Sequence, residues 1–389
     1  MSGRTGKATM HDLLLKGGRV IDPALGHDEL ADVAFADGRV AEIRPNLPAS
    51  AARDVRDVRD RLVVPGLIDL HTHVYWGGTS IGVDPEAIAF QGATATLVDA
   101  GTAGPANLAG FRRHVIDPAA PRILPYINVA FPGIFAFSET VMVGECEDIR
   151  LVDARECLRA ARAHADLVVG VKVRVGRHAS GANGVAPLDI AIEVAEELGL
   201  PVMAHLDLPP PGRREVMQRL RPGDVLTHCF RPFPNAPAKP DGGVREEVLA
   251  ARERGVIFDI GHGKGSFGFG TARAMLENGF APDCISSDVH SLSIAGPAYD
   301  LLVTLSKFLC LGMPLVEVIR AATGGPAAAL RRGDLGTLAP GLAADASVLE
   351  LREGAFEYED VDGVRLAGKQ RLLPAGLVLG GRWWAGPAA

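Results

Sequence analysis

Residues 66–74 read GLIDLHTHV, an apolar run that ends in two histidines placed two positions apart. Successive side chains of a β-strand point to opposite faces, so His71 and His73 share one face, and Asp69 lies on that face as well. A plain core strand would keep this face apolar to its end. The polar residues therefore indicate a site at the C-terminal end of a barrel strand, where barrel enzymes place their chemistry.

Four further polar side chains stand inside or at the end of other apolar runs. They are Lys172 in LVVGVKVRV, His205 in LPVMAHL, His228 in DVLTHCF and Asp288 in CISSDVH. Taken singly they have ordinary explanations, since a strand-ending histidine is often a satisfied core residue and Asp288 could cap a helix. Taken with the paired histidines, they supply the nitrogen and carboxylate ligands that suit Zn²⁺ or a similar divalent ion.

The position of Lys172 inside an apolar strand needs its own explanation, because lysine is rarely buried without a partner. A salt bridge at the barrel rim is one explanation. The other is that burial removes the proton from the amine, which then reacts with CO₂. The resulting carbamate would bridge two metal ions as a carboxylate does.

Between residues 66 and 336 the chain alternates strand-like and helix-like segments. The predicted strands are 67–73, 94–99, 122–130, 167–175, 201–206, 225–230, 256–262 and 284–290. The clearest predicted helices are 153–164, 189–198, 244–254 and 271–279, with Asp153 and Asp189 as candidate N-caps. Eight β-then-α units favour an α/β fold, the (β/α)₈ TIM barrel. A doubly wound sheet is the alternative, but it would not naturally gather all the ligands around one point.

The two ends of the chain have a different pattern. Residues 1–65 and 337–389 contain short alternating runs, such as DVAFADGRVAEI and ADASVLEL, which are typical of small antiparallel strands. We predict that these two segments form a small β-sandwich domain beside a barrel of residues 66–336.

The composition argues against several classes of function. The chain of 389 residues has a net charge of -7 and no basic stripe, so nucleic acid is a poor partner. No run of about eighteen uncharged apolar residues occurs, so no membrane span is predicted. The first residues, MSGRTGKATMHD, lack the apolar stretch of a secretory signal. The 5 cysteines, an odd number without a CxxC pair, fit a reducing cytoplasm.

The polar residues, in this order and context, resemble the amidohydrolase superfamily of metal-dependent hydrolases, over essentially the whole chain. The resemblance implies two divalent metal ions, by default Zn²⁺, held by His71, His73, Lys172, His205, His228 and Asp288. His71, His73 and Asp288 would bind the more buried ion, the other two histidines the more exposed one, and carboxylated Lys172 would bridge them. A metal-bridging hydroxide would attack the scissile carbonyl, with Asp288 as general acid and base. The family also suggests a homo-oligomer.

Two loops resemble the deacetylase branch, often labelled dihydroorotase-like, which includes esterases that act on acetyl-(R)-mandelate. These loops are FDIGHGKGSFGF (258–269) and SSDVHSLS (286–293). The implied function is ester or amide hydrolysis of a small carboxylate-bearing substrate. Cyclic amide hydrolysis, as in dihydroorotases and hydantoinases, is the alternative, although the segment HTHVYWGGTS lacks the arginine that those enzymes carry soon after the paired histidines. A catalytically inactive scaffold would typically have lost ligands, and this chain keeps all six.

Loops after the barrel strands should supply specificity. The tentative substrate contacts are His262, His290, Arg174, Lys264 and Tyr75. Arg174 and Lys264 are cations that could bind a carboxylate. His262, in the Gly-rich turn GHGKGSF, could instead stabilise its own loop, and Tyr75 could be ordinary packing at the rim.

Overall fold

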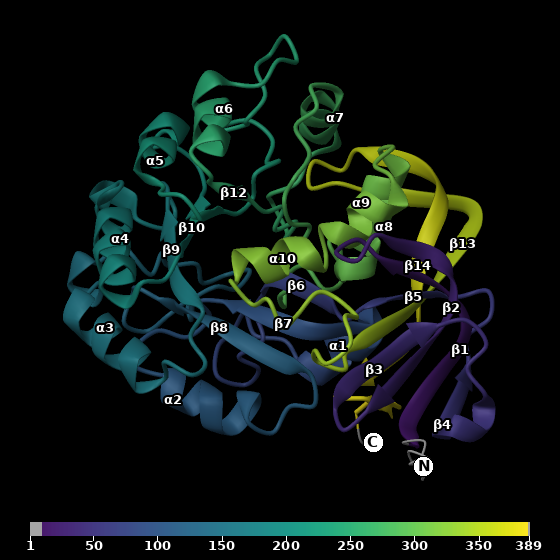
Figure 1. Ribbon diagram of the computed structural model, residues 1–389. Coiled ribbons are helices and arrows are strands. Elements are labelled where there is room, and N and C mark those ends of the chain that lie inside the picture. Colours follow the sequence, from purple (N-terminus) through teal and green to yellow (C-terminus); the bar gives the residue numbers. More distant parts are fainter. Residues whose placement is uncertain (1–9, 388–389) are drawn as a thin grey trace.

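The computed structural model describes residues 10–387, whose strands form two sheets (Figure 1). The first is a seven-stranded parallel sheet in which β6 to β12 follow one another in chain order. Its strands are β6 (Leu67–Thr72), β7 (Thr94–Ala100), β8 (Arg122–Asn128), β9 (Gly170–Val175), β10 (Val202–Leu206), β11 (Val225–Leu226) and β12 (Ile257–Phe258). The predicted α/β class with a parallel sheet is confirmed.

An eighth segment closes this sheet between β12 and β6. Cys284 pairs with Asp259, and Val289 pairs with Thr72, both as parallel bridges. The amide of His73 also donates to the carbonyl of Val289 at 3.0 Å. The sheet therefore curls into a TIM-barrel-like domain, and an open doubly wound sheet, which would keep two free edges, is wrong.

The last barrel strands are shorter than the sequence predicted. Regular pairing covers two residues in β11 and two in β12, and residues 284–290 contribute isolated bridges. The cause lies in the backbone, because His228, Gly261 and Asp288 have φ angles of 63°, 47° and 47°. The left-handed region interrupts an extended strand. The chain thus leaves the sheet at two of the predicted ligands.

Helices follow the strands and cover the outside of the barrel (Figure 1). They are α1 (Pro85–Gly92), α2 (Leu108–Phe111), α3 (Ala154–Ala163), α4 (Ala186–Leu198), α5 (Arg213–Arg219), α6 (Glu246–Glu253), α7 (Phe269–Glu277), α8 (Leu301–Cys310), α9 (Leu315–Arg320) and α10 (Gly324–Ala329). Asp153 caps α3 by accepting from the amide of Glu156, as predicted. The N-cap prediction for Asp189 is wrong, because Pro187 lies in the first turn and α4 starts at Ala186.

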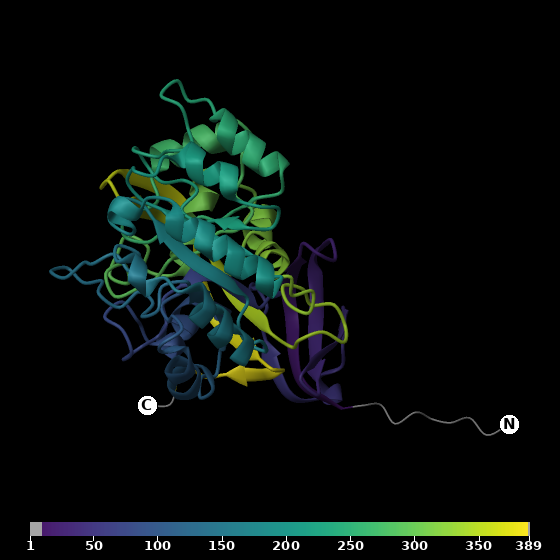
Figure 2. The same ribbon diagram turned by 90° about the vertical axis from the view of Figure 1, so that its left-hand side faces the viewer.

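The two chain ends together build the second sheet. It has eight strands in the order β15-β14-β13-β5-β1-β2-β3, with β4 paired to β1. The strands are β1 (His11–Asp22), β2 (His27–Ala36), β3 (Arg39–Arg44), β4 (Ala52–Asp57), β5 (Leu62–Pro65), β13 (Ala346–Glu359), β14 (Arg365–Leu379) and β15 (Arg382–Trp384). Figure 2 shows the N-terminal strands as a layer beside the barrel. The sandwich packing and the domain boundaries stay predictions. Residues 1–9, to which the prediction of no secretory signal applies, lie outside the described residues.

The second sheet anchors the barrel strand that carries the paired histidines. The amide of Leu67, the first residue of β6, donates to Ser347 Oγ of β13 at 3.0 Å. The amide of Gly66 donates to the carbonyl of Asp345 at 2.9 Å. Apolar side chains of both sheets also share one core cluster, for example Val64, Leu349 and Leu97. Among residues 10–387, no helix is long and apolar enough to cross a membrane.

Candidate metal centre

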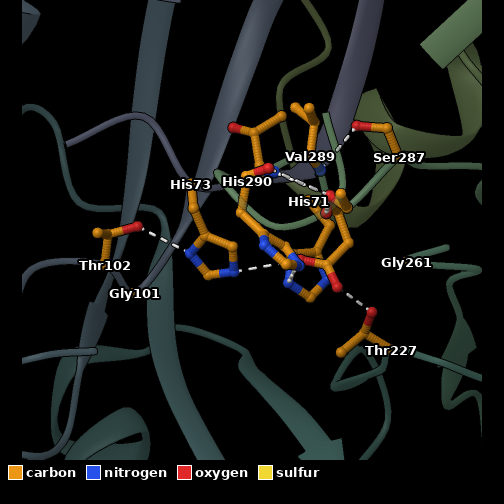
Figure 3. A network of polar contacts seen from close by, with 12 residues as sticks. His71, His73, Gly101, Thr102, Thr227, Gly261, Ser287, Val289 and His290 are labelled. Atoms are coloured by element: carbon orange, nitrogen blue, oxygen red, sulfur yellow. Dashed lines mark hydrogen bonds and ion pairs between the residues drawn. The ribbon is translucent and has the colours of Figure 1, made fainter. Parts of the chain in front are cut away.

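His71, His73 and Asp288 form the middle of a buried cluster, and Figure 3 shows the two imidazoles side by side. Asp288 Oδ1 lies 3.3 Å from His71 Nε2 and 3.2 Å from His73 Nε2. One ligand atom from each of the three residues lies within 4.8 Å of the others. A single divalent ion could therefore contact all three.

The other three predicted ligands adjoin this group. Lys172 Nζ lies 3.4 Å from His71 Nε2. The ring centroid of His228 lies 5.1 Å from that of His71 and 4.5 Å from that of His205. All six residues are thus brought together, although they come from strands spread around the barrel.

Burial sets the protonation of this cluster. Desolvation lowers the pKa of all four histidines, to about 3 for His73 and well below the ordinary value for His71, His205 and His228. Neutral imidazole is the form that binds metal ions. Desolvation also raises the pKa of Asp288 to about 6. A bound cation would favour the ionised carboxylate.

A hydrogen-bonded chain orients His71. Thr227 Oγ donates to Asp259 Oδ2 at 2.7 Å and lies 2.7 Å from His71 Nδ1. Because the hydroxyl proton points to the carboxylate, Thr227 accepts from His71 Nδ1. The proton of the imidazole is therefore on Nδ1, which leaves the lone pair of Nε2 free for a ligand.

His73 has a matching arrangement on the other side of the cluster (Figure 3). Thr102 Oγ donates to Asp99 Oδ2 at 2.7 Å and lies 2.8 Å from His73 Nδ1. The Nδ1 atom of His228 donates to the carbonyl of Gly261 at 2.6 Å. Three imidazoles therefore keep Nε2 free.

These supporting residues were missed in the sequence analysis. Asp99 and Asp259 did leave a signal, since each is a carboxylate in an apolar strand segment, TLVDA and VIFDI. Thr102 and Thr227 left none, because a threonine near a strand end is common in any barrel.

Close backbone packing holds Asp288 and His228 in their left-handed conformations, which are uncommon for residues with a Cβ. Asp69 accepts from the amide and the hydroxyl of Ser287 and so fixes the residue before Asp288. A Cβ on Gly263 would lie 2.2 Å from Asp288 Oδ2, and one on Gly261 would lie 2.8 Å from His228 Nδ1. Glycine is required at both positions by this close approach.

The donor set fits a divalent ion. The histidines are neutral, and His205 Nε2 is buried without a hydrogen-bond partner among residues 10–387. Lys172 is fully buried among nitrogen atoms, and desolvation lowers the pKa of its amine to about 7. Buried, electron-rich nitrogen atoms beside a carboxylate need a cation to balance them.

Two of the tentative substrate residues border the cluster. Arg174 is buried and follows Lys172 on the same face of β9, where its backbone pairs with that of His205. His290 is also buried, and its ring centroid lies 6.0 Å from that of His73. Both are positioned to meet a molecule bound at the cluster.

The other three have different surroundings. Both ring nitrogens of His262 have partners, Lys307 Nζ at 2.7 Å and the carbonyl of Gly263 at 3.0 Å, which favours the loop-stabilising alternative. Tyr75 stacks on Phe111 with ring centroids 4.6 Å apart, which favours ordinary packing. Lys264 is exposed, with Nζ 3.5 Å from the carbonyl of Gly296.

Comparison with known proteins identifies a family for this chain. The amidohydrolase family matches residues 62–371. A deacetylase of Brucella anthropi is 35% identical over 327 residues, which cover 84% of this chain and 81% of that protein. A deacetylase of Agrobacterium fabrum is 34% identical over 344 residues, covering 88% and 84%.

Solved structures point the same way. A structure described as an adenine deaminase has a TM-score of 0.89 and 28% identity, covering 96% of this chain and 99% of that one. A structure described as a dihydroorotase has a TM-score of 0.86 and 33% identity, covering 96% and 98%. The chain therefore belongs to the amidohydrolase family and is a hydrolytic enzyme.

Proposed function

We propose that this chain is a binuclear metal-dependent hydrolase that cleaves an ester or amide bond in a small carboxylate-bearing substrate, in the manner of a deacetylase. The observation that carries the proposal is the convergence of six candidate ligands in a largely buried cluster, with three of the four imidazoles oriented by hydrogen bonds. The similarity to two proteins named deacetylase supports the reaction class.

In this proposal, His71, His73 and Asp288 would hold one ion, and His205 and His228 would hold the other. Lys172 would carry a carbamate and supply a further carboxylate ligand. Zn²⁺ is the default ion for this donor set, although Mn²⁺, Fe²⁺ and Co²⁺ suit similar ligands. Bound ions of this kind polarise a carbonyl group and lower the pKa of water.

Asp288 is the residue that moves the proton. It accepts a proton from the attacking water and returns it to the leaving oxygen or nitrogen. Beside a bound cation its carboxyl would be ionised, which is the form that can accept this proton. The left-handed backbone at Asp288 directs the carboxylate toward His71 and His73.

Turnover by zinc-reconstituted protein across one matched panel tests the proposal. The panel contains acetylated α-hydroxy acids, N-acetyl-amino acids of both hands, and dihydroorotate with hydantoins. We expect hydrolysis of the acetylated acids that is lost on chelation and returns with metal. Full activity after chelation, together with no divalent metal by elemental analysis, would contradict it.

Cyclic amide hydrolysis is the second candidate, because the structure described as a dihydroorotase is 33% identical with a TM-score of 0.86. The residues after the paired histidines, VYWGGTS, offer no arginine for a substrate carboxylate. Activity on dihydroorotate or hydantoins alone would favour this candidate and leave the metal proposal standing.

A further inference from the structure

We propose that a cavity between helix α8 and strand β14 binds a zwitterionic α-amino acid with an apolar side chain. The cavity lies where the barrel helices α1 and α8 meet the C-terminal strands β14 and β15 of the second sheet. Its volume is about 560 Å³, which is the size of a small-molecule site. None of the six ligand candidates lines it, so the inference goes beyond the proposed function and does not depend on it.

The walls of the cavity are held together by contacts between elements that are distant in sequence. The amide of Leu372 in β14 donates to Ser306 Oγ of α8 at 2.9 Å, and the two elements lie side by side (Figure 1). Phe90 of α1 packs edge-to-face on Trp384 of β15, with ring centroids 5.8 Å apart. The cavity is therefore formed before any ligand enters.

Much of the lining is apolar. Leu302 and Val303 of α8 and the rings of Trp383 and Trp384 contribute to it. A Cβ on Gly376 would overlap the ring of Trp383, so this close approach requires glycine in β14. Both tryptophans are half-buried, and an apolar side chain in the cavity would remove more of their surface from water.

A buried carboxylate supplies the first polar group. Asp300 is 8% exposed, and its Oδ1 accepts from the amide of Val303 at 2.8 Å, which caps α8. The one side-chain partner of Oδ2 among residues 10–387 is Gln91 Nε2, at a long 3.4 Å. Burial raises the pKa of this carboxyl, as expected for a carboxylate without a cation in contact. An ammonium group beside Oδ2 would supply that cation.

A guanidinium group supplies the opposite charge. Nε of Arg371 is buried without a hydrogen-bond partner in the described part of the chain. No carboxylate oxygen of residues 10–387 lies within 4.0 Å of the Arg371 nitrogens. Arg371 still lowers the pKa of Asp300, so the two charges are near each other without forming an ion pair. A gap therefore separates an anion and a cation that line the same cavity.

The two groups together specify a zwitterion. An ammonium group would donate to Asp300 Oδ2, while a carboxylate on the same carbon atom would accept from Arg371. The side chain of the amino acid would then lie against the tryptophan rings. A simple amine or a simple acid would leave one of the two protein charges without a partner, so each should bind less tightly.

Calorimetry with the zinc-loaded enzyme tests the site, with L-phenylalanine and two analogues that each lack one charge. Phenethylamine lacks the carboxylate, and 3-phenylpropanoate lacks the ammonium group. We expect L-phenylalanine to bind at least about tenfold more tightly than either analogue. No binding of L-phenylalanine, or equal binding of all three compounds, would overturn the inference.

Two variants that each remove one charge locate the bound molecule. Arg371→Gln should weaken binding of L-phenylalanine about tenfold and leave that of phenethylamine unchanged. Asp300→Asn keeps an oxygen that can cap α8. It should weaken binding of L-phenylalanine by a similar factor and leave that of 3-phenylpropanoate unchanged. Because the variants change opposite ends of the site, either one tests the inference if the other does not fold.

Each variant has a matched control that does not line the cavity. Arg352 lies opposite Arg371 in the pairing of β13 with β14, and its guanidinium binds Glu350 at 2.7 Å. Asp153 caps α3 as Asp300 caps α8. We expect Arg352→Gln and Asp153→Asn to bind L-phenylalanine as the wild type does.

Unchanged binding of L-phenylalanine in Arg371→Gln and Asp300→Asn would overturn the inference, because the amino acid would then bind elsewhere, for example at the metal cluster. Equal weakening in the controls would overturn it too, since the loss would not be specific to the cavity. Calorimetry measures binding without turnover. A failure of the proposed hydrolysis would therefore leave a positive result at this cavity standing.

Discussion

Two buried lysines, Lys172 in barrel strand β9 and Lys307 in helix α8, have the same burial but different partners. Neither is exposed to solvent, and desolvation lowers the pKa of each to about 7. Lys307 Nζ has three partners, His262 Nε2 at 2.7 Å and the carbonyls of Pro297 at 2.8 Å and Glu359 at 2.7 Å. The one hydrogen-bond partner of Lys172 Nζ in the described residues is His71 Nε2, at 3.4 Å.

The comparison shows that a lowered pKa does not by itself identify a functional lysine. Three well-placed acceptors satisfy the ammonium of Lys307, so its role in joining the loop of His262 to the end of β13 explains its burial. The amine of Lys172 lacks such acceptors, and burial then has no structural explanation. A carbamate between two ions would provide one.

Replacing each lysine separately is the strongest test of this difference. We expect Lys172→Ala to lose bound metal and to lose turnover by orders of magnitude, because the bridging carboxylate is gone. Short carboxylic acids should restore part of both. Metal content is measured by elemental analysis, and Lys307→Met serves as the control that keeps its metal. Wild-type metal content in Lys172→Ala would remove the bridge from the proposal.

Asp288→Asn tests the proton-transfer role of Asp288 separately from its role as a candidate metal ligand. We expect turnover to fall by about 10²–10⁴-fold, because the amide cannot accept the proton. Thermal unfolding should stay close to that of the wild type, since the loop is held through Ser287 and the glycines. Unchanged kcat in Asp288→Asn would take the proton-transfer role away from Asp288.

The threonine relays predict a smaller effect at the same centre. Thr227→Val and Thr102→Val should each weaken metal binding by about 10–100-fold, because Nδ1 of the histidine loses its acceptor. Competition with a chelator measures the affinity. Thr323→Val is the control, since this buried hydroxyl donates only to the carbonyl of Ile319, at 2.7 Å. If Thr323→Val weakens metal binding as much as the other two variants, the loss comes from replacing any buried threonine and not from removing the acceptor of a histidine.

The pH dependence of stability tests the surroundings of Lys307. Its pKa is about 7 in the folded chain against an ordinary value of 10.5. Between these values the unfolded chain binds a proton that the folded chain lacks, so this group makes stability rise with pH. The free energy of unfolding of the wild type, relative to Lys307→Met, should therefore increase from pH 7 to pH 10, as measured by urea titration. If the free energies of unfolding of the wild type and of Lys307→Met change in parallel with pH, the three acceptors fully offset the desolvation of the Lys307 ammonium group.

Much of the barrel could be predicted from the sequence, because its strands are apolar runs separated by amphipathic helices. The ligand candidates could be found for the same reason, since a polar residue at the end of an apolar run is conspicuous. The short β11 and β12 could not, because the left-handed turns at His228 and Gly261 depend on packing around the site. A positive φ is uncommon for histidine, and glycine adopts either sign of φ, so neither residue type by itself predicts where the strand ends.

Contacts between residues that are distant in sequence were the other feature that could not be predicted. Thr227 lies 156 positions from His71, and Lys307 lies 45 positions from His262, so no local pattern links them. Lys307 did leave a signal, because it interrupts the apolar helix LLVTLSKFLC as Lys172 interrupts LVVGVKVRV. Only the structure distinguishes the two, through the acceptors around each amine.

The contact between Lys307 and Glu359 has a consequence for synthesis of the chain. All six ligand candidates leave the ribosome before β13, yet β13 supplies the carbonyl that fixes Lys307 and the hydroxyl of Ser347 that anchors β6. A nascent chain therefore contains every ligand while the anchor of β6 and the support of the His262 loop are still missing. Because β13 is translated after the ligand candidates, the anchored form of β6 cannot be complete until the last strands have been made.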